Sequence, residues 1–482
     1  MDVSPNTAVR IAILGGGIAG ATVRIQYLFL ATPISGITAD PDKAAIALGK
    51  LAGVEIEVFD QARELREIGA SIALQPCALR CLEKLGLGEE VERLAYRHGE
   101  HPLVHRHWRT SEVIETPLPN PLPIRSHQMA RFYRVHLHQL LVSHIPPDRI
   151  HLNKRVANVR CGECSRGVIV DFEDGTRWEG DAVVGADGIR SRTRSCFYPD
   201  YEISAGELVT LRQVFAASKL EGLDGIPKES CHWPGPDRQL FTSPLKGDLF
   251  SIVAFLPTHL LRSPEPRDNS TRSWGQTGST AELTGYYADW HPSIAALARV
   301  TPSINVYPDY HGPALPSLVV GDGRVVLIGD AGHPHGGAFA AGGTLSIEDA
   351  YTLSLCLAHA TSTSHSHATD TDANTAGPES ATSRPVAGEK DPQDRNPNPK
   401  ESAVRHAFEL FDACRREHVN RLVAAAERLR AQRRADEGRM LSDEEITQRV
   451  HRRQDVGWLA ENDAEKVFRE VLAKRGCGDT KN

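Results

Sequence analysis

The chain has 482 residues, of which 40% are hydrophobic and 24% are charged, and its net charge is −7. This composition is typical of a globular protein with two or three domains, and the acidic balance without a long basic run argues against nucleic acid as a partner. No apolar run is long enough to predict a membrane span, the N-terminus lacks the pattern of a secretory signal, and nine scattered cysteines predict reduced thiols in the cytoplasm.

The first predicted elements are a strand, a glycine-rich turn and a helix. Residues 9–14 form an apolar run that is typical of a buried parallel strand. Gly15, Gly17 and Gly20 follow as GxGxxG, and a helix-compatible stretch begins at Ala21. Such glycines allow a tight turn, let the backbone approach a pyrophosphate at the helix N-terminus, and let helix and strand pack closely. The pattern therefore predicts a dinucleotide site, with a purely structural turn as the alternative.

A second strand is predicted at residues 54–59 and ends at Asp60. In dinucleotide-binding folds an acidic residue at this place holds a ribose hydroxyl, about 20 residues after the glycines. Asp60 stands 45 positions after Gly15, so the spacing is too long. We interpret residues 27–50 as an insertion after the first helix, with translated intron sequence as the alternative. A solvated carboxylate at the strand end is the alternative for Asp60.

The remaining chain alternates between helix and strand patterns. We expect an antiparallel hairpin turning at Asp174-Gly175, an antiparallel sheet within 205–256, buried strands at 183–185 and 325–328, and helices over 76–85, 131–142, 343–357 and 403–435. Residues 361–401 are rich in Ser, Thr, Asp, Asn, Pro and Gly. Because they contain few large apolar side chains, we expect this segment to be disordered.

Three further segments carry a resemblance. They are residues 60–71 after the second strand, 185–191 (Gly-Ala-Asp-Gly-Ile-Arg-Ser), and 329–334 (Gly-Asp-Ala-Gly-His-Pro) with Gly342-Gly343 and 347–350 (Ile-Glu-Asp-Ala) behind it. In this order they resemble the aromatic-hydroxylase family of flavoprotein monooxygenases, the group of p-hydroxybenzoate and salicylate hydroxylases. The resemblance covers about residues 9–360 and 403–425.

The resemblance implies an α/β fold with a Rossmann-like FAD-binding domain, an inserted antiparallel-sheet substrate domain and C-terminal helices. The expected FAD-binding parts are 9–95, 125–200 and 306–360, the substrate-domain parts are 96–124 and 201–305, the disordered insertion is 361–401, and the C-terminal helices occupy 402–482. No second GxGxxG follows a strand, which argues against a separate nicotinamide domain.

The resemblance also implies roles for four charged residues. Asp60 takes the position of the acidic residue on the adenosine ribose, and Arg134 matches a flavin-contacting arginine. Asp187 matches a residue that contributes to both FAD and NAD(P)H binding, and Asp330 matches the aspartate on the flavin's ribityl chain. A simple turn is the alternative for Asp187, and a helix cap is the alternative for Asp330.

Gly342 and Gly343 would bring backbone N–H groups to the flavin ring at a helix N-terminus, which suits negative charge on reduced flavin. The full predicted cofactor-binding set is Gly15, Gly17, Gly20, Asp60, Ala73, Arg134, Asp187, Asp330, Gly342 and Gly343. Two positions depart from the family pattern: Gly337 stands where proline is frequent beside the flavin, and Cys77 stands where asparagine is common.

Arg212 and His333 are the candidate catalytic residues. Arg212 matches an arginine that steadies the phenolate in fungal relatives that hydroxylate or dearomatise phenols. Those relatives pair it with a tyrosine where this chain has Ser243, so the dearomatising subclass stays open, and a surface salt bridge is the alternative for Arg212. For His333 the alternative is local hydrogen bonding. Neither His333 with His335 nor the CxxC at Cys161 has further ligands at suitable spacing, so we expect no metal.

The function implied by the resemblance is an FAD-dependent monooxygenase. It would take a hydride from NAD(P)H and use O2 to hydroxylate a small phenolic or polyketide-like substrate, as a cytoplasmic monomer or homodimer. The alternatives are a flavin-dependent oxidase or halogenase on the same scaffold, and a non-catalytic flavin-binding scaffold protein. The Trp-x-Trp-x-Ile segment usual in halogenases does not occur in the sequence.

Overall fold

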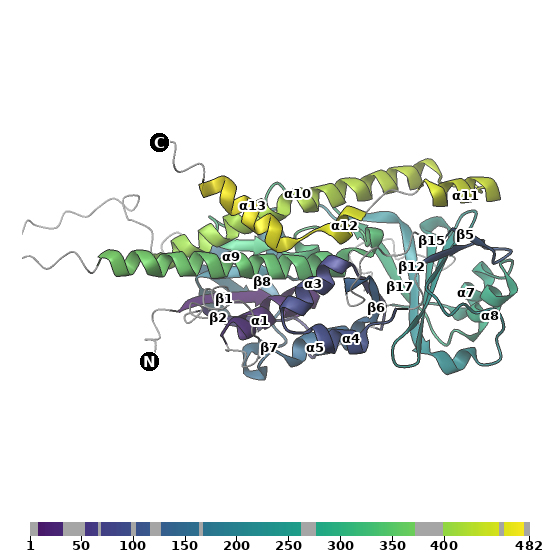
Figure 1. The fold of residues 1–482 in the computed structure, drawn as a ribbon, viewed down its shortest axis with the longest axis horizontal. Coiled ribbons are helices and arrows are strands. Elements are labelled where there is room, and N and C mark those ends of the chain that lie inside the picture. Colours follow the sequence, from purple (N-terminus) through teal and green to yellow (C-terminus); the bar gives the residue numbers. More distant parts are fainter. Residues whose placement is uncertain are drawn as a thin grey trace, which may run out of the picture.

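The chain folds into a mixed α/β structure built around two large sheets (Figure 1). This computed structural model describes residues 8–31, 54–65, 69–97, 103–115, 127–162, 167–261, 276–371, 399–452 and 457–476. Within these residues, no helix is both long and apolar enough to cross a membrane. The α/β fold class predicted from the sequence is confirmed.

The first large sheet has six strands and is mostly parallel. Its order is β18 (Val319–Val320), β19 (Val325–Leu327), β11 (Ala182–Gly185), β1 (Val9–Leu14), β2 (Val54–Phe59) and β7 (Ile150–His151). β1 pairs in parallel with β2 and with β11, and β11 pairs in parallel with β19. The carboxyl ends of these strands therefore meet at one edge, where open α/β sheets bind ligands.

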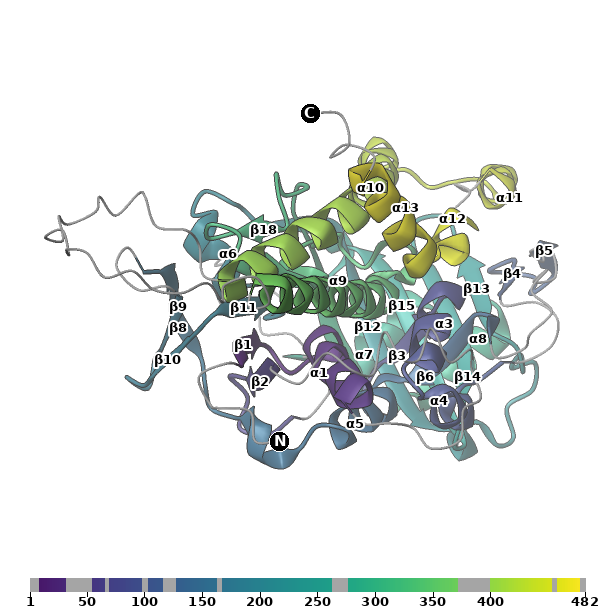
Figure 2. The same cartoon turned by 60° about the vertical axis from the view of Figure 1, so that its left-hand side comes forward.

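Both faces of this sheet are covered (Figure 2). Alternate side chains such as Ile11, Ile13 and Val184 pack under α1 (Ile18–Ala31), α9 (Gly342–Thr371) and α10 (Pro399–Ala435). The intervening side chains, such as Ala12 and Val183, pack on a three-stranded antiparallel sheet of β8 (Val156–Cys161), β9 (Val168–Phe172) and β10 (Arg177–Gly180). Burial on both faces explains why these strands read as continuous apolar runs.

The second large sheet has eight strands. Its order is β16 (Gln276–Thr277), β17 (Asn305–His311), β12 (Ser204–Ala216), β15 (Leu249–Pro257), β14 (Gln239–Leu245), β13 (Cys231–Pro234), β4 (Val104–Arg106) and β5 (Val113–Glu115). Leu211, Leu240 and Ile252 on one face pack against α7 (Thr280–Tyr286) and α8 (Pro292–Val300). We call the opposite face, which carries Arg212, the open face.

A two-stranded sheet lies between the two large sheets. It pairs β3 (Ser71–Leu74) with β6 (Ala130–Tyr133) and packs with α3 (Pro76–Lys84), α4 (Gly88–Leu94) and α5 (Arg134–Ser143). The hydroxyls of Ser71 on β3 and Ser251 on β15 lie 2.7 Å apart, which joins it to the open face. The remaining helices are α6 (Arg192–Phe197), α11 (Asp443–His451), α12 (Gly457–Glu461) and α13 (Ala464–Gly476).

Two sequence predictions change in the structure. The helix predicted from Arg131 begins at Arg134, because the three residues before it form a strand paired with β3. Both ends of the segment predicted to be disordered, 361–401, are helical, since α9 continues to Thr371 and α10 begins at Pro399. Residues 372–398 lie outside the described residues, as do residues 32–50 of the predicted insertion.

Candidate active site

The glycine turn after β1 depends on backbone contacts that leave no room for side chains. Gly15 has φ +111°, and a Cβ there would lie 2.3 Å from the carbonyl oxygen of Ala186. A Cβ at Gly20 would lie 2.0 Å from the carbonyl oxygen of Gly15. A Cβ at Gly17, by contrast, would meet no atom within 4 Å. Gly17 therefore borders open space just before α1, where a helix N-terminus attracts a phosphate.

Two of the predicted cofactor-binding carboxylates are engaged within the chain. Asp60 accepts hydrogen bonds from the backbone N–H groups of Gly16 (2.6 Å) and Ala62 (2.8 Å), so it fastens the end of β2 to the glycine turn. Asp187 accepts from the Ser191 hydroxyl, and from the Thr193 backbone and hydroxyl at 2.9 and 3.0 Å. Both residues order the sheet edge, and their contacts to a cofactor stay predictions.

Asp330 differs from these two residues. It lies in a single 3-10 turn, Gly329–Ala331, directly after β19. Its backbone carbonyl accepts from Arg194 (3.2 Å), but within the described residues its half-buried carboxylate makes no hydrogen bond or ion pair. Asp330 therefore presents a free charged acceptor at the ligand-binding edge, which fits a hydroxyl donor such as a ribityl chain.

The loop between Asp330 and α9 is conformationally strained. Gly337, Phe339 and Ala340 have φ values of 64°, 57° and 53°, and such values are unfavourable for Phe and Ala. The loop ends at Gly342, the first residue of α9. A Cβ at Gly343 would lie 2.4 Å from Ile72 Cδ1, so the first turn of α9 lies against β3.

This first turn is tied to the strand that carries Ala73. The Thr344 hydroxyl accepts a hydrogen bond from the Gln75 backbone N–H (3.0 Å), and Ala73 on β3 is buried. The unpaired N–H groups at a helix N-terminus attract negative charge. The glycine turn, Asp330 and this helix end fit a dinucleotide with an acidic ring system, and they are the residues that would hold FAD.

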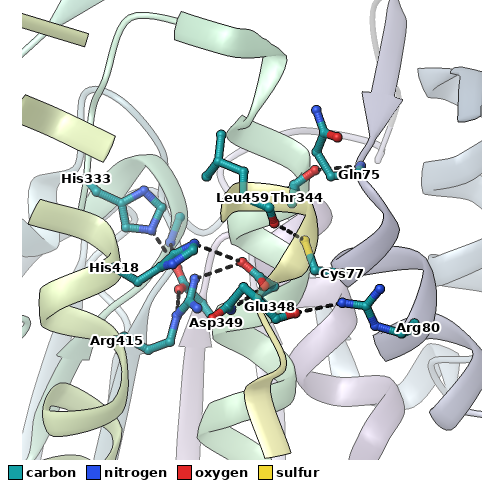
Figure 3. Close-up of polar contacts among 12 residues, drawn as sticks. Gln75, Cys77, Arg80, His333, Thr344, Glu348, Asp349, Arg415, His418 and Leu459 are labelled. Atoms are coloured by element: carbon teal, nitrogen blue, oxygen red, sulfur yellow. Dashed lines mark hydrogen bonds and ion pairs between the residues drawn. The ribbon is translucent and has the colours of Figure 1, made fainter. Parts of the chain in front are cut away.

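A buried cluster of charged side chains holds the loop between Asp330 and α9 in place (Figure 3). His333 Nε2 lies 2.6 Å from Asp349 Oδ2, and Arg415 Nε donates to Asp349 Oδ1 at 2.8 Å. Asp349 also accepts from the Gly329 backbone N–H (2.9 Å), so it ties the turn after β19 to α10. Burial favours a higher pKa for Asp349, but His333 and Arg415 outweigh it and hold that pKa well below its usual range.

Glu348 and Cys77 extend this cluster toward α3. Arg415 Nη2 lies 3.3 Å from Glu348, and the Asn462 side chain donates to Glu348 at 2.6 Å. Burial raises the pKa of Glu348 in spite of Arg415. Cys77, at the family's asparagine position, donates its S–H to the carbonyl oxygen of Leu459 (2.9 Å). The cluster therefore joins α3, α9, α10 and α12.

His333 is 1% exposed and belongs to this cluster, as the local hydrogen-bonding interpretation requires. Its catalytic role stays a prediction. His335 is also buried, and burial lowers its pKa to about 4, so the ring is neutral. Within the described residues no group of His, Cys, Asp and Glu could hold a metal ion, and Cys164 of the CxxC lies outside them.

Arg212 lies on the open face of the eight-stranded sheet. Its Nε donates to the Thr210 hydroxyl (2.9 Å), and its guanidinium lies 5.4 Å from the ring centroid of Tyr307 on β17. Arg212 makes no ion pair with any described residue, which disfavours the surface salt bridge. Burial lowers its pKa, Tyr307 opposes that effect, and Arg134 at the start of α5 adds to it.

The open face thus faces the two-stranded sheet. The charge of Arg134 on α5 lowers the pKa of Arg212. The guanidinium of Arg131 on β6 lies 4.6 Å from the ring centroid of Phe241 on β14. Arg131 Nε donates to Ser230 (3.1 Å), whose hydroxyl lies 2.8 Å from that of Ser243. Ser243 is therefore part of a buried contact. No sequence pattern pointed to Arg131 or Tyr307, because Arg131 meets Phe241 across two sheets and Tyr307 meets Arg212 through strand register.

Comparison with models of protein families finds no match. The chain is 30% identical to a 3-amino-4-hydroxybenzoate 2-monooxygenase of Streptomyces platensis, over 72% of this chain and 79% of that protein. It is 29% identical to a 6-hydroxynicotinate 3-monooxygenase of Bordetella bronchiseptica, over 72% of this chain and 82% of that one. Among solved structures, Klebsiella pneumoniae HpxO complexed with FAD and uric acid matches with a TM-score of 0.64 and 20% identity, over 96% of this chain and 95% of that chain.

Proposed function

Because this chain belongs to the FAD-dependent aromatic hydroxylases, we propose that it uses NAD(P)H and O2 to hydroxylate a small, hydroxylated aromatic substrate held by Arg212. Its class of activity, aromatic monooxygenation, is that of the family. The Streptomyces and Bordetella relatives are named for substrates with a hydroxyl group and a carboxylate on one ring. We therefore propose an anionic or readily ionised ring as the substrate.

The observation that carries this proposal is the position of Arg212. This cation lies opposite the elements that would hold FAD, which are the glycine turn, Asp330 and the first turn of α9. Arg212 has no carboxylate partner among the described residues and lies on the sheet face that meets β3 and β6. The first turn of α9 lies against the same β3. An aromatic anion between them would therefore have a counter-charge on one side and the flavin on the other.

The residues of the chain divide the work as follows. When bound, FAD reduced by NAD(P)H supplies the chemistry that transfers one oxygen atom of O2 to the ring. Arg212 would hold the ring oxygen as an anion, which makes the ring more nucleophilic. Thr210 and Tyr307 hold the guanidinium in place. The apolar side chains Phe241, Val253 and Phe255, which the strand register puts on the same face, would exclude water.

The test compares wild type with Arg212→Ala. In a screen of hydroxybenzoates and hydroxypyridine carboxylates, wild type should oxidise NAD(P)H faster with a substrate present and form one product with one added oxygen by mass spectrometry. Arg212→Ala should keep its FAD and yield mainly H2O2 instead of product. Arg299→Ala, which changes an exposed arginine on α8, should behave as wild type. Normal coupling in Arg212→Ala would contradict the substrate assignment.

A further inference from the structure

A carboxylate lies on the same strand and the same face as the partner of Arg212. Tyr307 stands opposite Thr210 in the register between β12 and β17, and Asp309 follows Tyr307 by two residues. Because side chains two apart in a strand share a face, Asp309 belongs to the open face together with Arg212. The register slips between Ala205 and Val209, so the backbone of β12 is irregular beside Asp309.

Two glycines make room for this carboxylate. A Cβ at Gly206 on β12 would lie 2.9 Å from Asp309 Oδ2. A Cβ at Gly336, in the loop between Asp330 and α9, would lie 2.6 Å from Asp309 Oδ1. The carboxylate therefore lies where the open face meets the loop between Asp330 and α9. A side chain at either glycine would displace it.

Three arginines and one glutamate surround Asp309, and none of them is bonded to it. Burial raises the pKa of Asp309, Arg433 and Arg430 on α10 and Arg212 on β12 lower it, Glu207 on β12 raises it, and the result is a pKa of about 6. Within the described residues its oxygens make no hydrogen bond and no ion pair. Glu207 is by contrast paired with Arg434 at 3.0 Å. Asp309 is therefore an ionised, unoccupied acceptor at neutral pH.

We propose that Asp309 accepts the hydroxyl proton of the aromatic substrate while Arg212 holds the resulting oxygen anion. The step breaks the substrate O–H bond and forms one O–H bond on the Asp309 carboxylate, so the phenol becomes a phenolate and the carboxylate becomes a carboxylic acid. No redox partner takes part in it. This inference rests on the proposed function, because it needs the substrate hydroxyl beside Arg212.

A general base is most effective when its pKa lies near the working pH, and a pKa of about 6 meets that condition. The loss of the proton adds electron density to the ring before oxygen is transferred. Arg212 alone would stabilise the anion without receiving the proton, since an arginine has no acceptor. Asp309 thus accepts the proton, and Arg212 stabilises the oxygen anion that remains.

The first experiment observes the ionisation directly. FAD-loaded wild type, Asp309→Asn and the control Asp224→Asn, which changes an exposed loop carboxylate, are titrated with 4-nitrophenol and 4-nitrocatechol. The pH lies above the pKa of Asp309, about 6, and below the pKa of the free probe hydroxyls, so that Asp309 is mostly ionised and the free probes are mostly protonated. We expect the absorption of the nitrophenolate on binding to wild type and Asp224→Asn, and that of the neutral phenol on binding to Asp309→Asn.

Each other outcome is decisive. Phenolate absorption on Asp309→Asn, or neutral probe on wild type, overturns the role of Asp309 and leaves the proposed function standing. Failure of both probes to bind to wild type overturns the proposed function together with this inference. The melting temperature and FAD content of Asp309→Asn identify a folding defect, in which case Asp309→Glu is titrated, and a neutral probe on this variant also overturns the inference.

The second experiment is a pH profile. The substrate-dependent rate of wild type should fall as the pH decreases through about 6, because the carboxylate becomes protonated there and cannot accept a proton. In Asp309→Asn the rate should be at least tenfold lower at pH 7, and this step in the profile should be absent. If Asp309 had only a structural role, the fall in rate near pH 6 would persist in Asp309→Asn. Such a persistent fall would contradict the inference.

Discussion

The edge of the six-stranded sheet and the open face of the eight-stranded sheet are built in different ways. At the edge, the contacts that define the geometry are backbone contacts: Gly20 meets Gly15 within one local motif, and Gly15 meets Ala186 just after β11. On the open face, Arg212 and Tyr307 are 95 positions apart in the chain, and the pairing of β12 with β17 brings their side chains together. The glycine turn at the sheet edge can thus be recognised from a local sequence motif, whereas the contacts on the open face depend on strand register.

This difference has an energetic consequence. A Cβ that collides with a carbonyl oxygen can be relieved only by moving two elements of the sheet, so substitution at the edge affects folding. A changed side chain on the open face meets other side chains, and these can adjust while the backbone stays in place. We therefore expect substitutions at the edge to cost stability or FAD, and substitutions on the open face to cost substrate turnover alone.

The largest effect is expected for Gly20→Ala. Its Cβ would lie 2.0 Å from the Gly15 carbonyl oxygen, so β1 and α1 must separate. We expect little folded protein, as measured by soluble yield and the melting temperature. Gly17→Ala is the matched control, because its Cβ meets no protein atom. It should fold normally and lose FAD affinity in a titration, and normal FAD affinity in Gly17→Ala would show that no phosphate lies there.

The next effect is expected for Arg415→Met. This change leaves Glu348 and Asp349 buried without their arginine, and removal of one partner from a buried pair costs about 3–5 kcal/mol of unfolding free energy. Arg416→Met on the same helix turn is the control. Arg416 is 45% exposed, so solvent screens its pair with the buried Asp412, and such solvent-accessible pairs contribute about 0–1 kcal/mol. Equal losses in urea denaturation would contradict the structural role of the cluster.

Much of the sheet edge could be predicted from sequence. The strands β1 and β2 have the bounds that their apolar runs predict, and the hairpin turns at Asp174-Gly175 between β9 and β10. The helix expected from Arg131 was wrong at its start, because Ala130 and Phe132 are buried in a strand whose partner, β3, lies about 60 residues earlier. Three or four residues are too few to separate a strand period from a helix period.

The open face could be predicted only in part. A family resemblance pointed to Arg212, and the position of the relatives' tyrosine is taken here by Ser243, which is buried in a contact with Ser230. Tyr307 lies beside Arg212 through strand register, and a sequence without its strand pairing carries no signal for this contact. Asp309 was missed for the same reason. Arg415 lies within the segment that resembles the family, yet its buried partners became visible only in three dimensions.

A smaller effect is expected for Asp330→Ala. Its carboxylate bonds to no described residue, so the melting temperature of FAD-free protein should hardly change. A charged hydrogen bond to the cofactor contributes about 1.5–3 kcal/mol, so FAD affinity should fall roughly 10- to 150-fold. Asp187→Ala is the informative counterpart, because it removes bonds to Ser191 and Thr193 and should lower the melting temperature as well. Unchanged FAD affinity in Asp330→Ala would contradict the match to the ribityl-binding aspartate.

The smallest effect is expected for Tyr307→Leu, and it separates the two regions most sharply. The Tyr307 ring lies 5.4 Å from the Arg212 guanidinium, and such a cation–π contact contributes about 0.5–2 kcal/mol. If that contact orients Arg212 for its ligand, its loss weakens the binding of an aromatic anion about 2- to 30-fold. Tyr307→Phe keeps the ring and should keep most of the affinity for the aromatic anion.

FAD affinity should be unchanged in both variants, because Tyr307 lies on a strand of the other sheet. Substrate analogues and FAD are titrated separately on each variant. A parallel loss of both affinities in Tyr307→Leu would mean that the open face and the sheet edge act as one unit, and the division between motif and register would then not extend to function.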